Sequence, residues 1–128
     1  MYLSDMRRFC VKVMIYSDGY GKERLFQNEL VLDAVLRNLE LLGEAAKQIP
    51  QDVRDSHPEI AWRRIAGLRD VLAHAYFSLE DDTLWLVISE SVPALHRQLN
   101  AINLNQEPTP RWPPTAFPPK RSTSNGSA

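Results

Sequence analysis

Apolar residues recur every three or four positions through most of residues 1–102, and no segment shows the strict alternation of a half-buried strand. The segment that begins near Asp81 shows this pattern most clearly. Its apolar residues follow intervals of 3, 4, 3, 4 and 3: Trp85, Ile88, Val92, Leu95, Leu99 and Ile102. Side chains at these intervals share one face of an α-helix, so the segment is predicted to bury that face. Pro93 should kink this helix, because proline lacks a backbone N–H.

Two other segments repeat the helical period. The first begins at Ser4, a candidate N-cap, and ends where Ser17–Gly21 breaks the pattern with two glycines and an aspartate. The second runs from Trp62 to about Ala75 and is interrupted by Gly67. A short helical turn around Gln51–Ser56 precedes it. Both segments are predicted to be amphipathic helices.

The longest helical segment is expected at about Glu23–Gln48, and Pro50 follows its end. One polar stripe runs along it at intervals of 4, 3, 4 and 3: Asp33, Arg37, Glu40, Glu44 and Lys47. Apolar residues cover another face: Leu32, Val35, Leu39, Leu42 and Ala46. Four amphipathic helices with mostly short connections predict an all-α fold, a four-helix up-down bundle.

The composition changes after Ile102. Asn103–Ala128 holds six of the nine prolines and ends in a Ser/Gly/Asn run, which favours an extended tail over a helix. Residues 1–102 are therefore interpreted as one helical domain and residues 103–128 as a Pro-rich tail. Trp112 and Phe117 leave two possibilities open, a mobile tail and an arm docked on a neighbouring surface.

Length and charge exclude several classes of protein. A chain of 128 residues has room for one sizeable core but not for two ordinary domains. The single cysteine, Cys10, excludes an internal disulfide and a structural zinc site built from several thiolates. The lack of a long apolar segment predicts a cytoplasmic protein with no membrane contact. The net charge is −1, with +2 in the tail and −3 before it, so contact with nucleic acid would need a local cluster of cations or two chains together.

The candidate site lies in the segment from Ile65 to Phe77. It places Arg69, Asp70, His74 and Tyr76 within eight residues, among small and apolar side chains. Asp70 and His74 are four apart and would be neighbours on a helix, so the carboxylate could fix the tautomer of the imidazole. Arg69 and His74 are about 140° apart around one helix, so a single helix does not direct both to one point.

These groups suit the cleavage of RNA without metal. The ribose 2′-OH needs a base to remove its proton, and the charge that develops on the phosphate needs a fixed cation. His74 could supply the base or acid, and Arg69 could bind two phosphate oxygens. The structural alternative is a salt bridge on the surface or a hydrogen-bonded histidine in the core, and the residues alone favour this alternative.

Three motifs follow one another in the sequence and carry a family resemblance. They are Leu-Gly-Glu-Ala-Ala-Lys at residues 42–47, His57-Pro58-Glu59-Ile60 with Trp62, and R-x-x-x-x-H-x-Y at residues 69–76. In this order the motifs resemble those of the HepT toxins of the HEPN (higher eukaryotes and prokaryotes nucleotide-binding) superfamily. The resemblance extends over about residues 3–102. Asp70 is a departure, because the superfamily commonly has asparagine there; a carboxylate would raise the pKa of His74 and partly neutralise Arg69.

This resemblance implies a metal-independent ribonuclease toxin that needs no cofactor and acts on cellular RNA, with tRNA the expected class. It implies a homodimer or a higher oligomer in which both copies of Arg69 and His74 line one cleft. It also implies pairing with an MNT-type nucleotidyltransferase antitoxin, in a type VII-like system. That antitoxin would transfer AMP to the motif tyrosine, Tyr76 here, and place bulk and charge beside Arg69 and His74.

Two other functions stay open at this stage. The chain could be a non-catalytic subunit that presents a tyrosine to a nucleotidyltransferase, or a nucleotide-binding module in which Arg69 grips a phosphate. Arg63 and Arg64 could steer RNA or simply be exposed arginines. Other polar and aromatic candidates are better explained as structural: Asn38, Glu44, His57, His96, Trp62 and Trp85.

Overall fold

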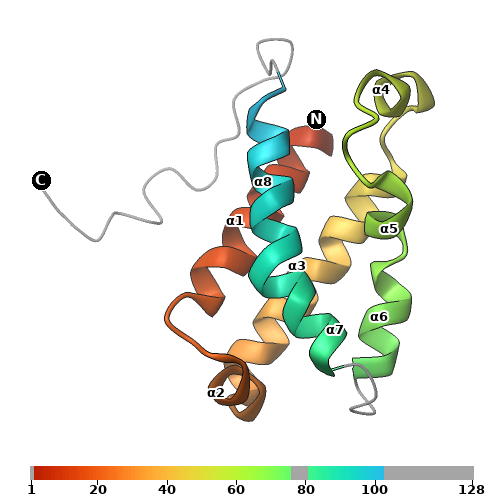
Figure 1. Cartoon of the computed structure of the whole chain (residues 1–128). Helices are drawn as coiled ribbons and strands as arrows, with labels where there is room; N and C mark the ends of the chain where they lie inside the picture. Colours follow the sequence, from red (N-terminus) through yellow and green to blue (C-terminus); the bar gives the residue numbers. More distant parts are fainter. Residues whose placement is uncertain (1, 76–80, 103–128) are drawn as a thin grey trace, which may run out of the picture.

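The computed structural model describes residues 2–75 and 81–102, and regular secondary structure in these ranges is helical throughout. Four antiparallel helical segments, which we call legs, form an up-down bundle (Figure 1). This arrangement confirms the predicted fold class. The first two legs are α1 (Tyr2–Ser17) and α3 (Glu29–Lys47). The third joins α5 (Trp62–Ala66) to α6 (Leu68–Ala75), and the fourth joins α7 (Asp81–Leu86), the π-helix η1 (Val87–Ser91) and α8 (Val92–Asn100). The short helices α2 (Lys22–Gln27) and α4 (Gln51–Ser56) lie in the connections at opposite ends.

Two parts of the predicted architecture lie outside the described residues. One is Tyr76, the last residue of the motif, and the other is the Pro-rich segment 103–128. Within the described ranges, no helix combines the length and apolar character that crossing a membrane requires.

The core forms where the predicted apolar faces meet. Ile88, Val92, Leu95 and Leu99 of the fourth leg are buried, and Trp85 and Ile102 pack partly buried against them. The polar stripe of α3 is exposed along its whole length, as its period predicts. Helical periodicity alone therefore identified which faces point inward.

The first helix begins earlier than predicted. Ser4 is not an N-cap: it lies inside α1 and is one of two buried polar residues of the described chain, with Asn38. The helix ends at Ser17, whose hydroxyl donates to the carbonyl of Val13 at 2.8 Å. Gly19 then adopts a φ of 81°, which glycine reaches without the Cβ clash of other residues.

The predicted long helix at 23–48 is wrong in one respect, because Asn28 divides it. Asn28 takes an extended conformation, and its side chain accepts a hydrogen bond from the backbone N–H of Val31 at 3.1 Å. Asn28 thus caps the start of α3 and ends α2. Its side-chain oxygen accepts from a backbone N–H that has no partner in the first turn of the helix. The break allows Lys22 of α2 to pair with Asp82 of α7, and this hydrogen bond raises the pKa of Lys22.

Pro93 changes the fourth leg differently from the expected simple kink. It lies at the start of α8, directly after the π-helical turn η1. A proline cannot donate to the carbonyl four residues earlier, so the preceding turn widens and the helix continues in the same leg. The apolar face stays continuous across the irregular turn, because Ile88 and Val92 are both buried.

Arg54 of α4 caps the end of α3. Its guanidinium donates hydrogen bonds to the backbone carbonyls of Ile49 (3.0 Å), Ala46 (3.2 Å) and Lys47 (3.1 Å). These carbonyls lie at the negative end of the helix and have few other partners, so a cation is favoured there.

Arg54→Ala should therefore lower the free energy of unfolding by about 1–2 kcal/mol, because charge-assisted bonds to backbone carbonyls are lost. Urea denaturation followed by circular dichroism measures this change. Arg97→Ala, at an exposed position of α8, serves as the control and should change stability by less than about 0.5 kcal/mol. Equal effects of the two substitutions would contradict the capping role.

His96 should make the fold sensitive to acid. Burial lowers the pKa of His96, and the nearby charges of Arg7 and Arg97 lower it further. Because the folded pKa lies below the unfolded value of about 6.5, the unfolded chain binds more protons between the two values. The contribution of neutral His96 to the free energy of unfolding is therefore fully present above pH 6.5 and is lost as the pH falls below that value. His96→Gln should reduce the loss of stability between pH 7.5 and 5.5, measured by urea denaturation.

Candidate functional site

Helix α6 carries Arg69, Asp70 and His74 of the motif and presents three different faces. Leu68 and Leu72 are buried and fix the helix against the bundle. Arg69 and Ala73 border the space between α6 and α3, while Asp70 and His74 lie farther around the helix, on its exposed side. The sequence therefore folds so that apolar residues anchor the helix and charged residues remain at the surface.

A close approach between backbones positions this leg. Gly43 is buried in α3, and a Cβ at that position would lie 3.1 Å from the carbonyl oxygen of Ile65 and 3.6 Å from the Cβ of Leu68. The lack of a side chain at Gly43 lets the junction of α5 and α6 pack directly on α3. The adjoining loop is held by Trp62, whose indole N–H donates to the carbonyl of His57 at 3.0 Å. Trp62 is thus a packing residue, as predicted.

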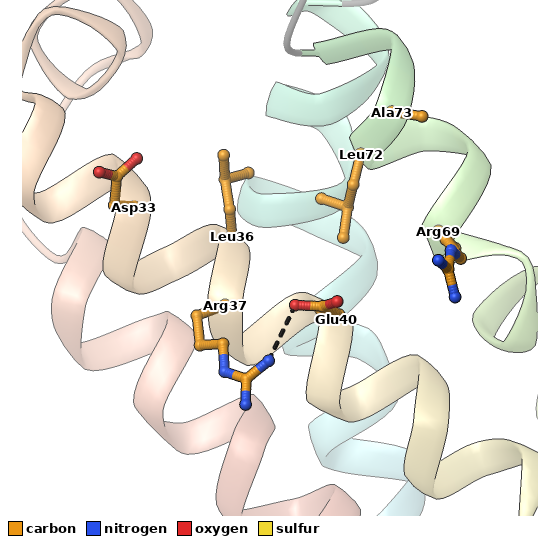
Figure 2. A pocket seen from close by; sticks show the side chains of 7 residues that line it. All are labelled: Asp33, Leu36, Arg37, Glu40, Arg69, Leu72 and Ala73. Atoms are coloured by element: carbon orange, nitrogen blue, oxygen red, sulfur yellow. Dashed lines mark hydrogen bonds and ion pairs between the residues drawn. The ribbon is translucent and has the colours of Figure 1, made fainter.

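A cleft of about 500 Å³ separates α3 from α6 (Figure 2). Helix α3 contributes Asp33, Leu36, Arg37 and Glu40, and α6 contributes Arg69, Leu72 and Ala73. Leu36 and Leu72 are buried, whereas the charged side chains are exposed. The cleft therefore has an apolar base and a charged rim with two cations and two carboxylates.

The charged side chains of the motif lack partners within the described chain. Arg69, Asp70 and His74 are all exposed, and no side-chain hydrogen bond or ion pair among the described residues includes them. The predicted contact between Asp70 and His74 is not formed. Arg69 lines the cleft and His74 does not, so the two side chains do not converge on one point within a single chain. All three remain available to an external ligand.

The other candidates occupy structural positions. Asn38 is buried, and its amide donates to the carbonyl of Ala34 at 2.8 Å while its Oδ1 has no partner. It does not line the cleft. Glu44 is exposed and pairs with Lys47 at 3.3 Å, as expected for the polar stripe. Arg63 and Arg64 are exposed on α5, where they leave the RNA-steering hypothesis open.

Metal and thiol chemistry gain no support from the described residues. No group of three or more His, Cys, Asp or Glu side chains in these ranges could hold a metal ion. His57 faces a single carboxylate, Glu59, at 3.7 Å. Cys10 is fully buried, which raises its pKa to about 12 and leaves its thiol protonated at neutral pH.

Comparison with known proteins decides the family. The family model described as "Ribonuclease HepT-like" matches residues 3–102. The chain belongs to this family. It is 50% identical over 62 residues to "Probable ribonuclease HepT" of Thermococcus cleftensis, an alignment that covers 48% of this chain and 56% of that relative.

Two further relatives match over most of their length. "Putative RNase TTE0752" of Caldanaerobacter subterraneus subsp. tengcongensis is 32% identical over 101 residues, which cover 79% of this chain and 90% of the relative. "Putative RNase MJ0125" of Methanocaldococcus jannaschii is 31% identical over 101 residues, covering 79% and 87%. The search of solved structures finds no match. Membership of the HepT-like family confirms the resemblance inferred from the motifs at residues 42–76.

The sequence did not identify the opposite wall of the cleft. Arg37 and Glu40 were interpreted only as members of an exposed stripe on α3, yet both line the cleft that Arg69 borders from α6. Their period shows that they share one face, but it does not show which neighbouring helix that face borders. The packing of α6 beside α3 supplies this information.

Proposed function

We propose that this HepT-like chain is a metal-independent ribonuclease toxin, in which His74 moves protons and Arg69 stabilises the phosphate. The observation that carries the proposal is that both side chains are exposed on α6 without partners in the described chain. Arg69 and His74 stand at the motif positions of a chain that belongs to a ribonuclease HepT-like family, and their exposure leaves both side chains accessible to an RNA ligand.

The proposed chemistry needs only the substrate and these side chains. The ribose 2′-oxygen attacks the adjacent phosphorus while a neutral imidazole accepts the 2′-OH proton. The bond from phosphorus to the 5′-oxygen breaks, and a protonated imidazole donates to that leaving oxygen. Arg69 offers two parallel N–H donors to the phosphate oxygens as negative charge develops. The products are a 2′,3′-cyclic phosphate and a 5′-hydroxyl end.

A second copy of the chain would complete the site. Arg69 and His74 are separated by about 140° around α6, and only Arg69 borders the cleft of its own chain. Two α6 helices related by a two-fold axis would supply two arginines and two imidazoles to one site, including the base and the acid. Duplicated cations would also favour RNA binding by a chain whose net charge is −1.

Apolar surface beside α6 supports such an association. A groove of about 530 Å³ lies between α5–α6 and the fourth leg. Apolar side chains from both legs line it, among them Ile65, Val71 and Leu86. Leu86 is 50% exposed in the single chain, so part of this apolar lining is accessible for burial by a second copy.

Regulation is proposed to act on Tyr76, two residues after His74. An MNT-type nucleotidyltransferase antitoxin would transfer AMP to its phenol oxygen. The added phosphate and nucleoside would occupy the place of the RNA phosphate beside Arg69 and His74. The proposed substrate is cellular RNA, with tRNA as the first candidate.

Incubation of unmodified protein with total tRNA in EDTA tests the proposal. Fragments with 2′,3′-cyclic phosphate ends, which disappear with His74→Ala, are the expected result. Mass spectrometry of the protein must first show that Tyr76 carries no AMP. Intact tRNA from protein with a free Tyr76 would contradict the ribonuclease and favour a non-catalytic partner of a nucleotidyltransferase.

A further inference from the structure

The charged rim of the cleft contains a cation that the motif does not include. Arg37 reaches from α3 into the same cleft that Arg69 borders from α6 (Figure 2). In this view the carboxylate of Glu40 lies between the two guanidinium groups. Arginines on both walls of one cleft suit a ligand with several phosphates, because a guanidinium donates bidentate hydrogen bonds to phosphate oxygens.

The present partner of Arg37 is easily exchanged. Its Nη1 donates to Oε1 of Glu40 at 3.0 Å, in an i, i+3 pair whose side chains are 64% and 46% exposed. Exposed pairs of this kind add little stability, because water solvates both charges well. Only one of the five donors of Arg37 is used in this bond. A phosphate could therefore replace Glu40 at small cost.

We propose that Arg37 forms a second RNA phosphate subsite beside Arg69, and that Glu40 competes with the RNA backbone for this arginine. The inference rests on the proposed function, because RNA is the ligand. Arg69 would bind the phosphate at the cleaved bond, and Arg37 would bind another phosphate of the same strand along the cleft. The apolar base formed by Leu36 and Leu72 keeps the two arginines on opposite walls. Arg37 is thus a binding residue and takes no part in proton transfer.

The chain supplies a matched control on the same helix. Lys47 pairs with Glu44 at 3.3 Å, also at i, i+3, and both side chains are exposed. Neither residue lines the cleft. Arg37→Ala and Lys47→Ala therefore remove one cation each from the same polar stripe, and only the first removes a cation from the cleft.

Binding of labelled tRNA in EDTA, measured by fluorescence anisotropy over a series of salt concentrations, tests the subsite. The protein carries His74→Ala in every sample, so that no RNA is cleaved. Adding Arg37→Ala should weaken binding about tenfold and reduce the slope of log Kd against log salt by about 0.7–0.9, the contribution of one phosphate contact. Glu40→Gln should tighten binding up to about fivefold, because the competing carboxylate is removed. Lys47→Ala should change Kd and slope by less than half as much as Arg37→Ala.

Three results would overturn the subsite: no binding of tRNA, equal effects of Arg37→Ala and Lys47→Ala, or weaker binding by Glu40→Gln. Circular dichroism establishes that each variant is folded. The assay does not depend on cleavage. If the wild-type chain leaves tRNA intact but Arg37→Ala still weakens binding selectively, the ribonuclease proposal fails and the subsite stands. If tRNA is cleaved but Arg37→Ala behaves like Lys47→Ala, only the subsite fails.

Discussion

His74→Ala and Arg69→Ala should each reduce RNA cleavage by at least about 100-fold and abolish toxicity in growing cells. Removal of a general base or acid costs about 10²–10⁴ in rate, and removal of a fixed donor to the developing charge costs about 10²–10³. Both side chains are exposed and make no side-chain bonds within the described chain, so the substitutions remove chemistry and little packing. Both variants should therefore unfold at nearly the wild-type urea concentration.

Single-turnover cleavage of tRNA in EDTA measures the expected loss, and growth after induced expression measures toxicity. His57→Gln and Arg97→Ala are the matched controls, because each changes the same residue type outside α6 and the cleft. Both controls should cleave at close to the wild-type rate. A His74→Ala or Arg69→Ala protein that cleaves as fast as its control would exclude the proposed mechanism. A folded variant with Arg69→Lys should recover part of the activity, because lysine restores the charge without the bidentate geometry.

The periodicity of the sequence predicted the fold because each helix buries only one face. The spacing of Leu39 and Leu42, or of Ile88 and Leu95, identifies that face without knowledge of its partner. Local breaks were harder to predict. Asparagine is a favoured N-cap residue, but the helical period of the flanking residues continues across Asn28, so the period alone does not show that its side chain caps a new helix by accepting from Val31. The wider turn η1 likewise reflects how the helix adapts to Pro93 while keeping its apolar face in the core.

The site was predictable only in part. The motif places Arg69 and His74 on one helix, and the helical period correctly predicts that they point in different directions. A contact of Asp70 with His74 was expected from spacing, but two exposed side chains gain little by pairing in water and do not do so here. The second wall of the cleft, with Arg37 and Glu40, follows from the packing of α6 against α3, which the close approach at Gly43 permits. No local pattern encodes that approach.

Tyr76→Phe should make the protein resistant to the proposed antitoxin. In the proposed regulation, the phenol oxygen of Tyr76 attacks the α-phosphorus of ATP, the antitoxin's base removes the phenol proton, and pyrophosphate leaves. Phenylalanine keeps the ring but lacks the attacking oxygen, so no AMP can be attached at this position. Cells that express both proteins should grow with the wild-type toxin and stop growing with Tyr76→Phe, an all-or-none difference.

Mass spectrometry after incubation with ATP and an MNT-type nucleotidyltransferase gives the direct measurement. The wild-type chain should gain one AMP on Tyr76, and Tyr76→Phe should gain none. Tyr2→Phe is the control, because Tyr2 is an exposed phenol (42%) at the start of α1, and this variant should be modified and silenced as the wild type is. Modification elsewhere on Tyr76→Phe, with loss of toxicity, would mean that bulk at another position silences the enzyme. In that case the short distance in sequence between Tyr76 and His74 would no longer explain the regulation, and the antitoxin would have to act by binding or by modifying another surface.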